Sequence, residues 1–203
     1  MTPRLPRPLR KVGLSYAAVV GAVALGLQAL PGHTRTRLVL AVSTDRDRLL
    51  QHPARSLLLS AFVVPSLSGL WLLPGTVLAV GAVQRAFGAR SAVLAGAAGH
   101  VAVSVIVAVL LERADDAPVT AASADVGVSY VLAATAGLAL STATRWWLLV
   151  GAAGGTAVAG GLLVADRTST DAGHLLAWLL GLAVALVVRG QRPHRGREQA
   201  CWT

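Results

Sequence analysis

The chain has 203 residues, of which 55% are hydrophobic and 13% are charged. Water-soluble domains carry roughly 25% charged residues, so this composition excludes an ordinary soluble domain. The net charge of +9 does not indicate a nucleic-acid partner, because the basic residues form short clusters between long apolar runs, as they do in membrane proteins. The single cysteine, Cys201, permits no internal disulfide and indicates no thiol chemistry.

Six uncharged runs have about the 20 residues that a helix needs to cross a bilayer core. They are residues 12–30, 57–83, 92–111, 119–140, 146–165 and 172–188. The second run is long and contains Pro65 and Pro74, which remove backbone donors and tend to kink helices, so part of it is expected to be re-entrant or interfacial. The predicted fold class is an all-α, polytopic membrane protein with a six-helix bundle over residues 12–188.

The segments outside these runs alternate in charge. The basic N-terminus (residues 1–11), the turn with Arg85 and Arg90, Arg145 and the basic tail (residues 189–203) together hold 11 basic residues and one acid. The other set (residues 32–56, 112–125 and 166–171) holds 7 basic and 8 acidic residues. Loops rich in Lys and Arg stay in the cytoplasm, so we expect a plasma-membrane protein with both termini inside. The basic tail is expected to contact anionic lipid.

The first outer loop, residues 32–56, is the one long connection between the runs. Within it, residues 37–50 interleave apolar and charged side chains, and we expect this amphipathic stretch to lie in the surface of the outer leaflet. Neither an internal repeat nor a soluble domain is visible in the sequence. The chain is therefore predicted to form one membrane domain.

Few polar groups fall inside the runs, and each is a candidate site because such groups are costly in hydrocarbon. Ser129 and His174 both follow the outer ends of runs that cross in the same direction, so the two side chains can meet at similar depth. A serine hydroxyl becomes a nucleophile when a neutral imidazole accepts its proton, and this placement permits such a pair. The alternative is that Ser129 bonds to a carbonyl one turn earlier and that His174 is an interfacial residue near Asp171.

Small residues recur at every fourth position below both candidates, which allows two membrane helices to approach closely. They are Ser129, Ala133, Gly137 and Ser141 in one run, and Gly173, Ala177, Gly181 and Ala185 in the other. In the third run, His100 precedes Ser104 by one turn. Either His100 is a buried neutral side chain bonded to Ser104 or a nearby carbonyl, or it has a structural or oxyanion-assisting role.

At these residues the chain resembles the rhomboid family of intramembrane serine proteases, over residues 12–188. Similar proteins have six spans, a long amphipathic first outer loop and a Gly-x-Ser-Gly motif, which Gly127, Val128, Ser129 and Tyr130 match except at the last position. The small-residue line after the family's histidine is similar to His174, Ala177 and Gly181. The resemblance implies that Ser129 is the nucleophile, that His174 is the general base, and that the substrate is a transmembrane helix of another protein.

The chain also departs from the family pattern. The His-x-x-x-Asn pair that stabilises the oxyanion corresponds approximately to Ser68 and Leu72, and the second glycine of the serine motif is Tyr130. Gly127, Tyr130, Ser68 and His100 are the candidate oxyanion or cavity residues. The sequence leaves open a protease, a non-catalytic protein that binds transmembrane partners, and, more weakly, a small transporter. No cofactor or metal is expected, because no two of the five histidines lie at ligand spacing.

Overall fold

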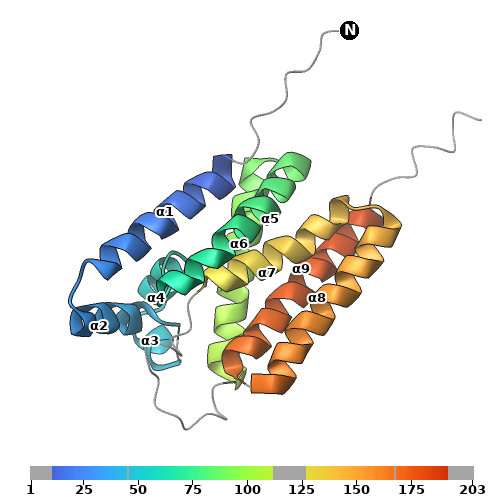
Figure 1. Cartoon of the computed structure of the whole chain (residues 1–203). Coiled ribbons are helices and arrows are strands. Elements are labelled where there is room, and N and C mark those ends of the chain that lie inside the picture. The colour runs from blue at the N-terminus through green and yellow to red at the C-terminus, as the bar shows by residue number, and fades with distance from the viewer. Residues whose placement is uncertain (1–10, 45, 112–126, 167, 192–203) are drawn as a thin grey trace, which may run out of the picture.

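The computed structural model describes residues 11–44, 46–111, 127–166 and 168–191, and every element in this part of the chain is helical. Six helices form the bundle (Figure 1): α1 (Lys11–Gln28), α5 (Leu72–Phe87), α6 (Ala89–Ile106), α7 (Val128–Ala139), α8 (Arg145–Asp166) and α9 (Ser169–Gly190). α6 continues through one π-helical segment, η2 (Val107–Leu111), and α7 ends in a short 3₁₀ turn, η4 (Leu140–Thr142).

Five helical segments of the described residues are long and apolar enough to cross a membrane: Lys11–Gln28, Leu67–Phe87, Ala89–Val109, Arg145–Asp166 and Ser169–Gly190. The remaining apolar helix, Val128–Thr142, is shorter. It corresponds to the C-terminal part of the predicted run 119–140. Residues 119–126 of that run lie outside the described residues. The predicted all-helical membrane bundle is therefore confirmed, with five long helices and one short one in the described part.

The first connection is built from three short helices, α2 (Gly32–Val42), α3 (Arg46–Gln51) and α4 (Pro53–Ser60). The stretch 37–50, predicted to be one amphipathic segment, is thus divided between α2 and α3. Val39 and Val42 of α2 pack with Val63, which follows α4, in a small apolar cluster. This cluster holds the connection against the bundle.

The long apolar run 57–83 is divided as its prolines suggested. α4 ends at Ser60, residues 61–66 form turns that include Pro65, and a 3₁₀ segment, η1 (Leu67–Trp71), leads into α5. Pro74 lies in the first turn of α5, where backbone N–H groups have no partner within the helix, so it does not interrupt the helix. The part of the run before Pro65 therefore belongs to the first connection rather than to a span.

The short α7 is the central helix of the bundle and packs against α5, α6 and α9 (Figure 1). Its closest contact is with α9: a Cβ on Gly137 would lie 2.6 Å from the carbonyl oxygen of Trp178, and a Cβ on Gly181 would overlap the carbonyl of Ala134. Backbone-to-backbone packing of this kind requires small residues at the crossing. It fixes the depth at which the first turn of α7 sits beside the first turn of α9.

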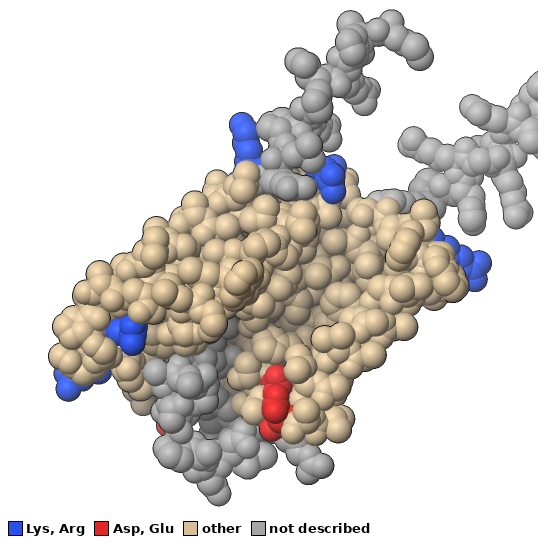
Figure 2. All heavy atoms as spheres, in the orientation of Figure 1, with Lys and Arg blue, Asp and Glu red and all other residues tan. Residues whose placement is uncertain are grey.

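Among the described residues, acidic side chains lie at one end of the bundle, together with the arginines of the first connection, whereas the charged residues at the other end are all basic (Figure 2). We call one end the basic end, because Lys11, Arg85, Arg90, Arg145 and Arg189 lie on helix termini there. None of the three described acidic residues, Asp47, Asp166 and Asp171, lies at that end. At the basic end, α5 turns into α6 at Gly88, whose φ of +90° is a backbone conformation that favours glycine.

Candidate functional site

The first turn of α7 is anchored to the first connection through Gly127. The Gly127 amide donates to the carbonyl of Ser60 at the end of α4 (3.0 Å), and the Gly127 carbonyl accepts from Val131 (3.0 Å) to begin α7. A Cβ at position 127 would overlap the imidazole ring of His100. Glycine is therefore required here, because α7 starts directly on that ring.

His100 is fully buried in α6 and joins this helix to α4. Its Nε2 lies 2.9 Å from the Leu57 carbonyl and 3.1 Å from Ser60 Oγ, both on α4, and its Nδ1 lies 3.3 Å from Ser104 Oγ one turn along α6. This geometry agrees with the interpretation of His100 as a buried histidine bonded to Ser104 and to a nearby carbonyl. The interaction ties the first connection to the bundle.

The Leu57 carbonyl also decides which nitrogen of His100 carries the proton. A carbonyl only accepts, so Nε2 must be the protonated nitrogen, and Nδ1 then accepts from the Ser104 hydroxyl in the neutral ring. In this tautomer, the nitrogen beside Ser60 donates a proton and cannot remove one from the Ser60 hydroxyl. The Ser60 and His100 pair is therefore a structural contact rather than an activated nucleophile.

Tyr130 lies between the two histidines of the bundle. Its ring is fully buried; its centroid is 5.5 Å from that of His174, edge-on at 68°, and 6.4 Å from that of His100. Gly173 makes room for it on α9, because a Cβ there would lie 2.6 Å from Tyr130 Cζ. The residue that fills the space beside His174 is thus the tyrosine that replaces the second glycine of the serine motif.

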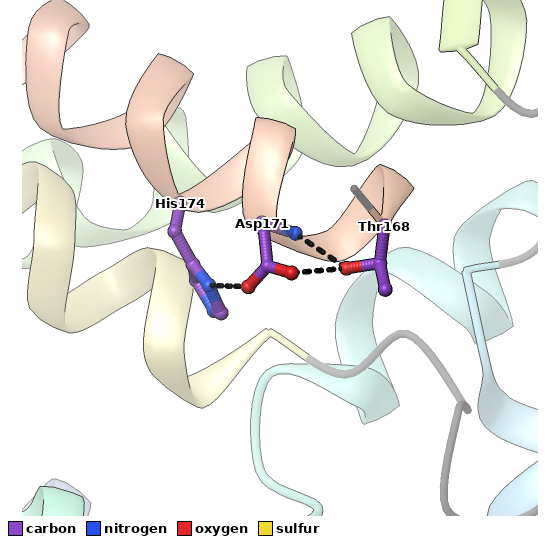
Figure 3. Close-up of polar contacts among 3 residues, drawn as sticks. All are labelled: Thr168, Asp171 and His174. Carbon is purple, nitrogen blue, oxygen red and sulfur yellow. Dashed lines mark hydrogen bonds and ion pairs between the residues drawn. The ribbon is translucent and has the colours of Figure 1, made fainter. Parts of the chain in front are cut away.

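His174 belongs to a chain of polar groups at the start of α9 (Figure 3). Its Nδ1 lies 3.7 Å from Asp171 Oδ1, while Asp171 Oδ2 accepts a 2.5 Å hydrogen bond from Thr168 Oγ1. Thr168 in turn caps the helix by accepting from the Asp171 amide at 3.1 Å. The imidazole reaches from α9 toward α7, with Nδ1 on the side of the carboxylate and Nε2 buried.

Ser129 is the second residue of α7 and is half-buried. Consecutive helical residues are about 100° apart around the axis, so the side chain of Ser129 leaves α7 in a different direction from the fully buried Tyr130. Among the described residues, no hydrogen bond joins Ser129 to His174, and the ring in contact with the imidazole is that of Tyr130. The structure therefore brings the two elements together without forming a Ser129 and His174 hydrogen bond.

A family model of rhomboid-like proteins matches residues 12–194. The chain belongs to the rhomboid-like protein family. This match covers the six apolar helices and the first connection, so the resemblance noted from the sequence is confirmed. No match is found for the chain among curated proteins or among solved structures.

The positions that correspond to the rhomboid oxyanion pair lie in and beside η1. Ser68 is exposed, and its hydroxyl is hydrogen-bonded to that of Ser66 at 2.6 Å, while Leu72 is half-buried and apolar. Neither residue presents a buried polar donor to α7.

The helix-contact residues of the sequence analysis lie where α7 meets α9. Ala177 and Gly181 are buried on α9, together with Gly173 and Ala185, and Gly137 is buried on α7. Ala133 is half-buried against the cluster that contains Tyr130, Ala134 and Ala177. On α7, Tyr130 and Ala134 are buried, whereas their neighbours Ser129 and Ala133 are only half-buried.

Sequence reasoning did not single out Thr168 or the partners of His100 on α4. The first could have been found, because Thr168 and Asp171 have the Thr-x-x-acid spacing of an N-terminal capping pair. The contacts of His100 with Leu57 and Ser60 span 43 and 40 residues of chain, and no spacing rule indicates them. No group of three or more His, Cys, Asp or Glu side chains able to hold a metal occurs among the described residues.

Proposed function

We propose that this rhomboid-like protein binds transmembrane helices of other membrane proteins without cleaving them. The observation that carries the proposal is the position of Tyr130, whose ring packs edge-on against the His174 imidazole in the space that Gly173 leaves open. Activation of a serine requires the imidazole within hydrogen-bond reach of its hydroxyl. With Tyr130 packed against His174, the chain keeps the rhomboid-like fold, but the arrangement does not favour activation of Ser129 by His174.

α8 supplies a surface suited to such a partner. This helix packs mainly against α9, and Leu148 is its one buried residue. Its exposed side carries a small-residue stripe at four-residue spacing, formed by Ala153, Ala157, Gly161 and Ala165. A Cβ at Gly161 would meet nothing within 4 Å, so another helix can approach the backbone there.

Site-specific photo-crosslinking in the native membrane tests this proposal. A photoreactive residue at Ala157 should give a crosslink to a membrane-spanning segment of another protein. Gly161→Trp should abolish that crosslink because the bulky ring holds the partner helix away. Leu162→Trp is the matched control, since Leu162 is exposed on the same helix but off the stripe, and it should leave the crosslink intact. Crosslinks to lipid alone, or equal effects of both variants, would overturn the proposal.

A second candidate, a protease with Ser129 as nucleophile and His174 as base, is favoured by one observation. Asp171 lies beside His174 Nδ1, which is how a carboxylate orients an imidazole whose Nε2 acts as a base. This function requires the Ser129 hydroxyl to come within hydrogen-bond reach of His174 Nε2. It predicts that a co-expressed transmembrane substrate is cut near its outer end and that Ser129→Ala abolishes the cleavage without lowering the abundance of the protein.

A further inference from the structure

An apolar groove runs along α6 between α1 and the end of α4. Val93, Ala97 and Val101 are exposed on one face of α6 and form its wall, while Val12 and Tyr16 of α1 lie opposite. The volume is about 200 Å³. The lining is almost wholly apolar, and it reaches inward as far as His100, whose ring nitrogens are already hydrogen-bonded.

The groove opens because α1 packs mainly against α5 and only lightly against α6. Two polar contacts hold α1 in this position. The Val12 amide donates to Gln84 Oε1 at 3.0 Å at one end of the groove, and the Tyr16 hydroxyl donates to the carbonyl of Ala61 farther along. The space is therefore a defined feature of the packing of α1.

The shape of the groove limits its occupant. From Val93 to Val101, α6 rises about 12 Å, and the cavity volume along this length is about 200 Å³. An α-helix with its side chains is about 10–12 Å across and cannot enter. A single hydrocarbon chain can, and the length of the groove is close to half of the bilayer core, which is about 30 Å thick.

Three exposed cations lie on helix termini at the end of the groove nearest the basic end of the bundle. Lys11 precedes Val12, Arg90 lies two residues before Ala92, and Arg85 follows Gln84, which binds the start of α1. The described acidic residues lie at the other end of the bundle. A phosphate at this end of the groove would therefore meet positive charge without competition from the described carboxylates.

We infer that this groove binds one anionic phospholipid from the surrounding bilayer. One acyl chain lies along Val93, Ala97 and Val101 toward His100, and the phosphate lies among Lys11, Arg85 and Arg90. The lining of the groove includes Val131 of α7 but neither Ser129 nor His174, and the inference does not rest on the presence or absence of catalysis. The bound lipid fills the space between α1 and α6 that the packing of the helices leaves open.

Titration of the purified full chain with phosphatidylglycerol, followed by native mass spectrometry, tests the acyl-chain part. Ala97→Phe should weaken binding about tenfold, a loss of roughly 1.4 kcal/mol, because the ring occupies the groove. Ala98→Phe is the matched control, since Ala98 is exposed one residue away but does not line the groove, and it should bind as the wild type does. A second pair of variants tests the same contact if Ala97→Phe is poorly folded. It consists of Val93→Trp and its control, Leu94→Trp.

Phosphatidylcholine with the same acyl chains tests the headgroup part. The wild type should bind phosphatidylglycerol more tightly than phosphatidylcholine. The double variant with Lys11→Gln and Arg90→Gln should reduce that preference by about tenfold or more, because each cation contributes roughly 1 kcal/mol to the binding of an anionic headgroup. Arg145→Gln, at the same end of the bundle but on α8, should leave it unchanged. Equal binding of the two lipids, unchanged binding by Ala97→Phe and Val93→Trp, or a polypeptide displaced from the groove by these variants would overturn the inference.

Discussion

At the scale of single residues, the interior of this protein is organised by two histidines and the tyrosine between them. His100 holds α4 against α6, Tyr130 packs between the two rings, and His174 is linked through Asp171 to the cap of α9. Glycines at positions 127 and 173 make this arrangement fit, because a Cβ at either would overlap an aromatic ring. Small changes here should therefore have large effects on stability.

Gly127→Ala is expected to destabilise the protein by about 1–3 kcal/mol, because the added methyl group overlaps the His100 ring and the surrounding core must shift. Gly160→Ala is the control, since a Cβ there meets nothing within 4 Å, and it should be neutral or slightly stabilising in its helix. Thermal unfolding in detergent compares the two. Equal midpoints would show that α7 does not start on the imidazole.

Removal of His100 should release α4 from the bundle. His100→Ala deprives the Leu57 carbonyl and Ser60 hydroxyl of their partner, whereas Ser104→Ala removes one long hydrogen bond and should cost only about 0.5–1.5 kcal/mol. We expect faster tryptic cleavage after the exposed Arg55 of α4 in His100→Ala than in Ser104→Ala. Indistinguishable cleavage rates would contradict the role assigned to His100.

At the scale of elements, the contact between α7 and α9 is the tightest in the bundle, and it determines which side chains of the first turn of α7 meet His174. Gly137 lies against the backbone of α9, and Gly181 lies against the carbonyl of Ala134. The close approach leaves no room for rotation of either helix about its axis. The orientation of Tyr130 toward His174 is therefore a consequence of contacts one to two turns farther along α7, at Ala134 and Gly137.

Gly181→Ala should lower the unfolding midpoint by an amount equivalent to about 1–3 kcal/mol, because its Cβ would overlap the Ala134 carbonyl. Gly154→Ala, on the exposed side of α8, adds a methyl group to open space and should not destabilise the fold. If the two variants unfold alike, α7 and α9 are farther apart than the structure places them.

The sequence predicted where the helices lie along the chain better than it predicted which residues of each helix are buried. Uncharged runs located the bundle, and the four-residue spacing of Gly173, Ala177, Gly181 and Ala185 identified residues that are all buried on α9. On α7 nearly every side is apolar or small, so periodicity could not show that Tyr130 and Ala134, rather than Ser129 and Ala133, would be the buried residues. Contacts such as His100 with Leu57 depend on how distant segments pack, which spacing does not encode.

At the scale of the whole molecule, charge distinguishes the two ends of the bundle. Five helix termini carry Lys or Arg at the basic end with no described acid beside them, whereas Asp166 and Asp171 lie at the opposite end, where the arginines of the first connection also lie. Because loops rich in basic residues stay inside, we propose that the basic end faces the cytoplasm of a cell whose plasma membrane holds the protein. The groove between α1 and α6 would then open to lipids of the inner leaflet.

Cysteine labelling tests this orientation. In a Cys201→Ser background, Arg90→Cys should react with a membrane-impermeant maleimide only after the membrane is permeabilised. Thr168→Cys, exposed at the other end of the bundle, should react in intact cells. The opposite pattern would reverse the proposed topology.

The central proposal is that Tyr130, which packs against the His174 imidazole, takes the place of a hydrogen bond between Ser129 and His174, so that the serine is not activated. Labelling of the purified, monodisperse protein with a fluorophosphonate serine probe tests it most directly, with an active rhomboid protease as the positive control. We predict that the wild type labels no more than Ser129→Ala does. Labelling of the wild type that is lost in both Ser129→Ala and His174→Ala would contradict the claim and establish the protease.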